Sequence, residues 1–178
     1  MGKREVKRRA VFLDRDGVIN HAIVRAGKAF SPCTREEFTM GTDVAASIST
    51  LKNSGFKVIV VTNQPDIARG KLEQDNLDWM TDKIRKETKV DDIIVCPHDD
   101  GDECDCRKPL PGMILHSAEK WGIDLANSYM IGDGWKDMEA GRQAGCRCIL
   151  IDTAYNKDVD CERRVKTLAQ AVQCILKG

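Results

Sequence analysis

Two aspartates on either side of one arginine, Asp14 and Asp16 in the segment VFLDRDG, are residues whose type and spacing suit chemistry. Two carboxylates this close together repel each other unless a cation or a proton lies between them. Both follow directly on the apolar residues of positions 11–13. A sequence that places two acids where an apolar run ends therefore predicts that a cation binds there.

A second group of polar residues is suited to binding phosphate. Thr62 and Asn63 come at the end of the apolar run in VIVVTNQ, where a hydroxyl and an amide can donate hydrogen bonds to phosphate oxygens. Lys108, in the segment RKP, carries a compact positive charge and precedes a proline that favours extended backbone around it. These residue types predict a phosphate-bearing ligand.

A third apolar run ends at Asp133 in MIGDGWKD, and Asp137 follows four residues later. Asp14, Asp16 and Asp133 offer hard oxygen ligands without an imidazole, which suits Mg²⁺ completed by water and a substrate phosphate. Asp137 has three possible roles: it holds Lys108, it holds a metal-bound water, or it is an ordinary carboxylate in the first turn of a helix.

The segment CPHDDGDECDC carries four soft metal ligands within positions 96–106. Three thiolates and one imidazole in two close pairs favour a tetrahedral zinc ion, and four protein ligands leave no open position. We therefore predict a structural zinc loop within 96–106 that aims the next two residues, Arg107 and Lys108, at the substrate. The alternative is a set of free thiols beside an exposed histidine. The predicted zinc ligands are Cys96, His98, Cys104 and Cys106.

The elements that must position these residues alternate along the chain. Apolar runs at 10–13, 57–61, 93–95, 129–131 and 146–151 are typical of strands buried on both faces of a parallel sheet. Helical spacing or capping residues mark 43–54, 77–88, 111–121, 135–144 and a last helix over 165–175. This alternation predicts an α/β fold with an open, doubly wound, mostly parallel sheet, in one domain over 1–178 with no separate cap domain. Ligands of such sheets bind at the carboxyl ends of the strands, where the polar residues lie.

Other classes of protein are excluded or disfavoured. An EF-hand loop from Asp14 would need Gly and Glu where Ile19 and Arg25 stand, AGKA lacks the residues of a P-loop, and no strand is followed by G-x-G-x-x-G. With 28 basic and 28 acidic residues, the chain predicts no nucleic-acid or membrane partner. The basic segment MGKREVKRRA leads into no signal-peptide core. We expect reduced cysteines, a cytoplasmic location and a monomer.

The order D-x-D-G, strand-T-N, K-P and G-D-x-x-x-D resembles the haloacid dehalogenase superfamily of aspartate-nucleophile phosphatases. The resemblance implies that Asp14 attacks phosphorus and carries a phospho-aspartate, and that Asp16 protonates the leaving group and then activates water. It also implies that Asp133 binds Mg²⁺. The residues assigned to the substrate are Thr62, Asn63, Gln64, Arg107 and Lys108.

Within that superfamily, the zinc loop resembles the branch of heptose 1,7-bisphosphate and histidinol-phosphate phosphatases. The stretch VTNQPDIARG is similar to the heptose enzymes, which implies removal of the 7-phosphate of D-glycero-D-manno-heptose 1,7-bisphosphate. Histidinol phosphate, another small phosphomonoester, and a zinc-stabilised scaffold without activity are the alternatives. Gly134 stands where relatives often have a basic residue. Arg25 and Lys28, in a predicted flap over 20–32, either reach a second phosphate or lie in a solvated loop.

Overall fold

The apolar runs of the sequence form the strands of one sheet in the computed structural model, which describes residues 7–178. The sheet has six strands in the order β5-β4-β1-β6-β7-β8, and every neighbouring pair is parallel. The predicted open, parallel α/β sheet is therefore confirmed. Its strands are β1 (Arg9–Leu13), β4 (Phe56–Asn63), β5 (Asp92–Cys96), β6 (Tyr129–Gly132), β7 (Arg147–Ile151) and β8 (Arg164–Val165).

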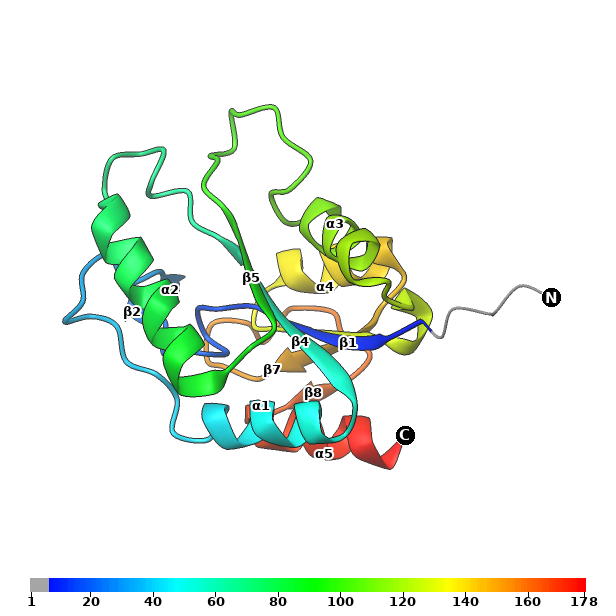
Figure 1. Ribbon diagram of the computed structural model, residues 1–178. Coiled ribbons are helices and arrows are strands. Elements are labelled where there is room, and N and C mark those ends of the chain that lie inside the picture. The colour runs from blue at the N-terminus through cyan, green and yellow to red at the C-terminus, as the bar shows by residue number, and fades with distance from the viewer. Residues whose placement is uncertain (1–6) are drawn as a thin grey trace.

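Helices cover both faces of the sheet (Figure 1). Side chains alternate along a strand, so Val58 and Val60 of β4 pack on one face, and Ile59 and Val61 pack on the other. The first face is covered by α1 (Val44–Asn53), α2 (Gln74–Thr88) and α5 (Leu168–Lys177), and the second by α3 (Gly112–Trp121) and α4 (Trp135–Ala144). A short 3-10 helix, η1 (Leu125–Asn127), precedes β6. Burial on both faces is the reason that the strands are continuously apolar.

The predicted start of the last helix, at Val165, was wrong. Val165 lies in β8, where it pairs with Ile151, and α5 begins only at Leu168. Thr167 precedes the helix in extended backbone, and its side chain accepts a hydrogen bond from the Gln170 amide. A spacing of three residues between Val165 and Leu168 fits a helix, but a strand followed by an N-cap places the same residues in the same core.

The chain order creates a crevice at one edge of the sheet. From β1 in the middle, the chain continues to β4 and β5 on one side and then returns to β6 on the other side of β1. The amide of Asp14 still bonds the carbonyl of Ile131, so the ends of β1 and β6 stay together. Such a reversal of strand order leaves a ligand crevice outside the carboxyl ends of the strands.

A hairpin follows β1 and forms the predicted flap. Its strands β2 (Ile23–Arg25) and β3 (Lys28–Phe30) are antiparallel and are joined by Ala26 and Gly27. Both turn residues have positive φ, 48° and 75°, as the mirror-image turns that suit the twist of a two-stranded hairpin require. The hairpin and the loop of residues 97–111 approach the sheet from its carboxyl edge.

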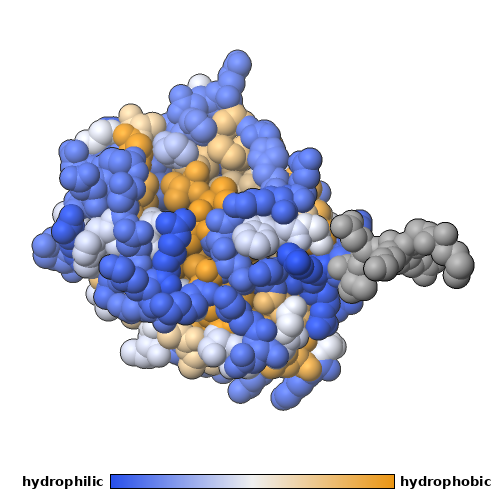
Figure 2. All heavy atoms as spheres, in the orientation of Figure 1, coloured by the Kyte–Doolittle hydropathy of each residue, from blue (hydrophilic) through white to orange (hydrophobic). Residues whose placement is uncertain are grey.

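The described surface is largely hydrophilic on the side seen in Figure 2, and apolar residues show there mainly in a hollow near the middle. Among residues 7–178, no helix has both the length and the hydropathy that a membrane crossing requires. Most of the basic segment noted at the N-terminus, residues 1–6, lies outside the described residues.

Candidate active site

A cavity of about 250 Å³ opens at the carboxyl edge of the sheet. The ends of β1, β4 and β6, the start of α4, the hairpin and the loop before α3 all contribute to its wall. It is thus built from segments far apart in the sequence. Among the predicted site residues, it is lined by Asp14, Asp16, Asn63, Lys108 and Asp133.

Lys108 is buried between two carboxylates at the floor of the cavity. Its ammonium donates to Asp14 at 2.8 Å, to Asp137 at 2.6 Å and to the carbonyl of Val61 at 2.9 Å. Burial alone would lower the pKa of Lys108, but Asp137 and Asp14 outweigh it and raise that pKa. Of the three roles considered for Asp137, the structure has it hold Lys108, while its second oxygen also caps α4 by accepting from the Gly134 amide at 3.0 Å.

A third carboxylate, that of Asp133, lies beside the two that hold Lys108. Oxygens of Asp14, Asp133 and Asp137 lie within 4.8 Å of one another. Burial and the neighbouring carboxylates raise the pKa of Asp14 well above its usual value, and burial together with Asp137 raises the pKa of Asp133 to about 7. The cluster therefore carries more negative charge than Lys108 neutralises. Hard oxygen ligands around uncompensated charge fit Mg²⁺, which Asp14 and Asp133 can hold.

Asp133 is fixed by two residues of the loop after β7 that the sequence analysis missed. The hydroxyl of Tyr155 donates to a carboxylate oxygen of Asp133 at 2.5 Å, and the buried Asn156 amide donates to the Asp133 carbonyl at 2.8 Å. On the other side stands Gly17, whose φ is +86°; a Cβ there would come within 2.0 Å of an Asp133 oxygen. Tyr155 and Asn156 stand four and five residues after β7 ends at Ile151, so the rule that marked Asp133 points to Asp152 instead and gave no signal for either of them.

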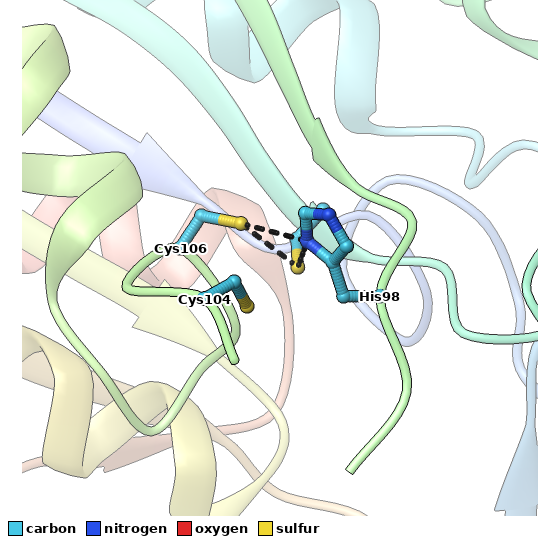
Figure 3. Close-up of side chains that lie close together, drawn as sticks. His98, Cys104 and Cys106 are labelled. Carbon is cyan, nitrogen blue, oxygen red and sulfur yellow. Dashed lines mark hydrogen bonds between the residues drawn. The ribbon is translucent and has the colours of Figure 1, made fainter. Parts of the chain in front are cut away.

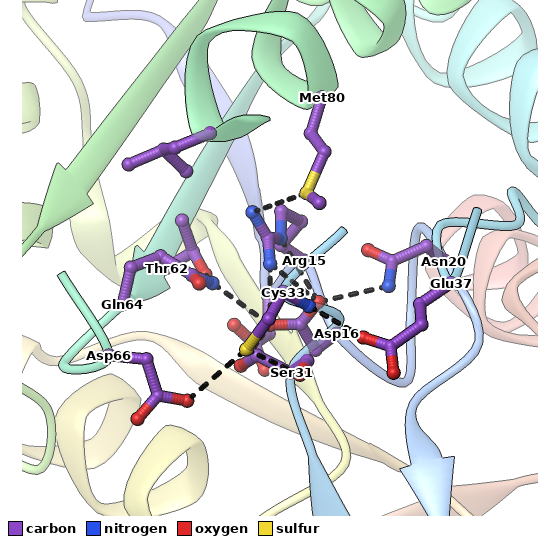
Figure 4. A network of polar contacts seen from close by, with 12 residues as sticks. Arg15, Asp16, Asn20, Ser31, Cys33, Glu37, Thr62, Gln64, Asp66 and Met80 are labelled. Carbon is purple, nitrogen blue, oxygen red and sulfur yellow. Dashed lines mark hydrogen bonds and ion pairs between the residues drawn. The ribbon is translucent and has the colours of Figure 1, made fainter. Parts of the chain in front are cut away.

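Asp16 lies at the wall of the cavity in a separate network (Figure 4). Its carboxylate accepts from Arg15 at 3.0 and 3.1 Å, Asn20 at 2.9 Å, Ser31 at 2.7 Å and Gln64 at 2.9 Å. Burial would raise the pKa of Asp16, but the Arg15 guanidinium and the three neutral donors outweigh it and hold that pKa below its usual value. In this arrangement Asp16 is a carboxylate.

The carboxyl group of Asp16 therefore does not join the cluster in which the sequence analysis expected it. Asp14 and Asp133 come together with Asp137 instead. Residues two apart share one face only while the backbone stays extended. Here the chain turns back after β1, and the amides of residues 18–20 all bond the carbonyl of Arg15.

The end of β4 and the residue that follows it hold the Asp16 carboxylate and the backbone of Lys108. Gln64 is fully buried, and its amide donates to Thr62 and to Asp16 at 2.9 Å each. Asn63 holds the backbone of Lys108 in both directions, donating to its carbonyl at 2.9 Å and accepting from its amide at 3.0 Å. Asn63 lines the cavity, while Gln64 contacts Asp16 and Thr62 contacts Gln64.

The four predicted soft ligands lie together beside this site (Figure 3). The sulfurs of Cys96 and Cys106 are 3.1 Å apart, and His98 Nδ1 lies 3.5 Å from the first and 3.3 Å from the second. Ligand atoms of tetrahedral zinc lie about 3.5–3.8 Å apart, so the group, with Cys104, could hold zinc. Burial and the neighbouring thiols raise the pKa of Cys106, which a bound cation would reverse.

Arg107 was expected to point at the substrate and is directed elsewhere. Its guanidinium donates to Asp100 at 2.9 Å and to the His98 carbonyl at 3.1 Å, both within the loop of residues 97–106. Arg25 of the hairpin pairs with Glu37 at 3.1 Å and does not line the cavity. Lys28 lines a groove next to the cavity, alongside Asp133 and Tyr155.

Known proteins resemble this chain over most of its length. A family model described as HAD-hydrolase-like matches residues 105–173. A D-glycero-beta-D-manno-heptose-1,7-bisphosphate 7-phosphatase of Rhodopseudomonas palustris is 38% identical, over 78% of this chain and 81% of the relative. A D-glycero-alpha-D-manno-heptose-1,7-bisphosphate 7-phosphatase of Photorhabdus laumondii is 37% identical, over 84% and 85%.

A solved structure agrees with these relatives. The D,D-heptose 1,7-bisphosphate phosphatase of B. bronchiseptica, crystallised with magnesium and phosphate, superposes with a TM-score of 0.83 at 30% identity. The match covers 95% of this chain and 98% of that protein. That protein was crystallised with the two ligands that the cavity's residue types suit.

Proposed function

Because the chain belongs to the haloacid dehalogenase-like hydrolases, in the family of the heptose 1,7-bisphosphate 7-phosphatases, we propose that it removes the 7-phosphate of D-glycero-D-manno-heptose 1,7-bisphosphate. The reaction is a phosphomonoester hydrolysis. One observation carries the proposal: a buried lysine joins a carboxylate of raised pKa at the floor of an open cavity. A nucleophilic carboxylate and a cation for the phosphoryl oxygens are the two groups that such a reaction needs first.

In the first step, a carboxylate oxygen of Asp14 attacks phosphorus, and the bond from phosphorus to the sugar oxygen breaks. The Lys108 ammonium, already 2.8 Å from Asp14, binds the oxygens of the transferring phosphoryl group. A bound Mg²⁺ supplies positive charge that offsets the repulsion between the carboxylate and the phosphate. The products are a phospho-aspartate at position 14 and the free sugar hydroxyl.

Asp16 carries the proton in both steps. It gives a proton to the leaving sugar oxygen and then accepts one from the water that cleaves the phospho-aspartate. Its present donors favour the carboxylate, so one of them must leave an oxygen free before that oxygen takes a proton. We infer that this donor is Ser31, because it follows the strand β3 of the hairpin, which forms a two-stranded sheet separate from the main sheet.

The experiment measures the turnover of heptose 1,7-bisphosphate by an Asp14→Asn variant in the presence of magnesium. The amide keeps the shape of the side chain but cannot attack phosphorus, so we expect turnover to fall by at least about a thousandfold with the fold retained. Asp82→Asn, on the exposed side of α2, is the matched control and should keep its rate. Turnover of Asp14→Asn at the wild-type rate would rule out the covalent route.

A substrate panel tests the sugar. It contains both anomers of heptose 1,7-bisphosphate together with histidinol phosphate, the alternative substrate within this branch. We expect kcat/KM for one bisphosphate anomer to exceed that for histidinol phosphate by at least about tenfold, since one charged contact is worth about that factor. The reverse preference would overturn the choice of substrate. Lack of turnover of every ester would favour a scaffold that zinc stabilises.

We also infer a zinc ion on the Cys/His group, a cytoplasmic location and a monomeric state, with a small phosphorylated sugar as the ligand and no nucleic acid or membrane as partner. A zinc site with three cysteines needs reduced thiolates, which the cytoplasm maintains. Light scattering in solution tests the monomer, and a mass of two chains would contradict it.

A further inference from the structure

The wall of the cavity carries a second cation besides the one on its floor. Of the lysines and arginines in residues 7–178, Lys108 and Lys136 line the cavity. Lys108 is 3% exposed and is held by two carboxylates, so it belongs to the phosphoryl group that is transferred. Lys136 stands in the first turn of α4, three residues after Asp133, where the cavity meets solvent.

Lys136 is free to bind a ligand. Its ammonium lies 3.8 Å from Asp100, and the two side chains are 37% and 71% exposed. A long ion pair between exposed groups contributes little free energy. The neighbouring Gly134 has no side chain that could compete for the same space. An anion that arrives at the rim therefore meets a lysine with only a weak prior partner.

Aromatic side chains flank this lysine at the mouth of the cavity. Trp135 of α4 is 56% exposed and Phe30 of β3 is 45% exposed, and both line the cavity. The Lys136 ammonium lies 5.8 Å from the ring of Trp135. Flat apolar surfaces beside a few polar groups are typical of sites that hold the carbon face of a small ligand. The mouth thus offers apolar walls for a sugar and a cation beyond them.

Asp100 links the rim to the Cys/His loop. Besides its contact with Lys136, it pairs with Arg107 at 2.8 Å. Asp100 thus lies between two cations, and Asp99 is a further carboxylate 3.9 Å from Arg107. Arg107 is held within its loop, so the cation left to an incoming ligand is Lys136, and a phosphate dianion would attract that ammonium more strongly than the single charge of Asp100 does.

Resting on the proposed function, we propose that Lys136, together with the wall formed by Trp135, is the subsite for a second anionic group on the substrate, and that Asp100 competes with that group for the lysine. The substrate class is then a sugar with two phosphates, one transferred at Asp14 and one retained at the rim. Selectivity for a bisphosphate over a monophosphate comes from the rim and not from the catalytic floor.

The test compares kcat/KM for heptose 1,7-bisphosphate with kcat/KM for heptose 7-phosphate as a ratio. We expect Lys136→Met to lower this ratio by about tenfold, the value of one charged hydrogen bond, and Lys136→Arg to restore most of it. Asp100→Asn should raise the ratio several-fold, because it removes the competitor. Lys86→Met, exposed on α2 and outside the cavity, is the matched control and should leave the ratio unchanged.

Two failures are distinguishable. If the wild-type protein hydrolyses neither sugar, the proposed function fails. If it prefers the bisphosphate and Lys136→Met keeps that preference, or if Asp100→Asn lowers it, the rim subsite is wrong while the proposed function stands. Circular dichroism of each variant excludes loss of the fold as the cause of a changed ratio.

Discussion

Replacing Asp133 by asparagine is expected to make the metal-free protein more stable, although it removes a residue of the candidate metal site. Asp133 is 8% exposed and lies beside Asp137 and Asp14 without enough positive charge nearby. Its pKa is raised from 3.8 to about 7, chiefly by burial and then by Asp137. A neutral amide of the same shape avoids the free-energy cost of burying a charged carboxylate next to two others.

The sign and size of the effect follow from the same pKa. In the unfolded chain Asp133 has an ordinary pKa, so between pH 3.8 and about 7 the folded state binds the proton more tightly than the unfolded state does. The free energy of unfolding therefore falls as pH rises through this window. At about 1.4 kcal/mol for each tenfold change in proton concentration, the loss reaches roughly 4 kcal/mol above pH 7.

The assay is urea unfolding at pH 4 and pH 8 in magnesium-free buffer without a chelator, so that any zinc remains bound. The free energy of unfolding of Asp133→Asn should exceed that of the wild type by up to about 4 kcal/mol at pH 8, or roughly 8–16 °C in Tm, and by little at pH 4. Added magnesium should stabilise the wild type and not the variant. Asp152→Asn is the control with the opposite sign, because Lys157 and Arg164 lower the pKa of Asp152.

A destabilising titration of Asp133 is contradicted if metal-free Asp133→Asn is no more stable than the wild type at pH 8. An equal difference in the free energy of unfolding between the two proteins at pH 4 and pH 8 would contradict it as well. A gain that does not depend on pH would come from packing and not from the titration of a carboxyl group.

Three further predictions concern the same region. Lys108→Met leaves two buried carboxylates unpaired and should lower the free energy of unfolding at pH 8 by about 3–5 kcal/mol in urea titration; an unchanged value would contradict the buried ion pairs. Tyr155→Phe removes the hydroxyl that holds Asp133 and should weaken magnesium binding about tenfold by isothermal titration calorimetry, whereas equal affinity would mean that the contact does not orient the ligand. Cys106→Ser should reduce bound zinc from about one ion per chain and lower Tm, and wild-type protein without zinc by elemental analysis would contradict the site.

The sequence was sufficient for five of the six strands of the sheet and for Asp14 and Asp133 at its edge. Strands buried on both faces must be continuously apolar, so β1, β4 and β6 are visible as runs, and the first polar residue after each run marks its carboxyl end. Asp14 and Asp133 were identified in this way. The Cys/His group could also be predicted from the sequence, because its four ligands fall within one short segment. Ligands this close along the chain can be recognised without knowing the tertiary fold.

Which of these side chains contact one another depends on the tertiary fold. Lys108 contacts Asp14 across 94 positions and Asp137 across 29, and Tyr155 reaches Asp133 across 22. Such contacts depend on the order of the strands and on the paths of the loops between them, which local spacing does not encode.

The same limit explains the differences at Asp16, Val165 and Lys136. Asp16 has the spacing of a second metal ligand, but the turn after β1 carries it to its own donors. Val165 fits a helical repeat, yet pairing with β7 makes it a strand residue. In the sequence, nothing distinguishes Lys136 from an ordinary surface lysine. The structure places the start of α4 at the cavity, and the elements packed around a charged side chain determine whether it faces bulk water or a ligand.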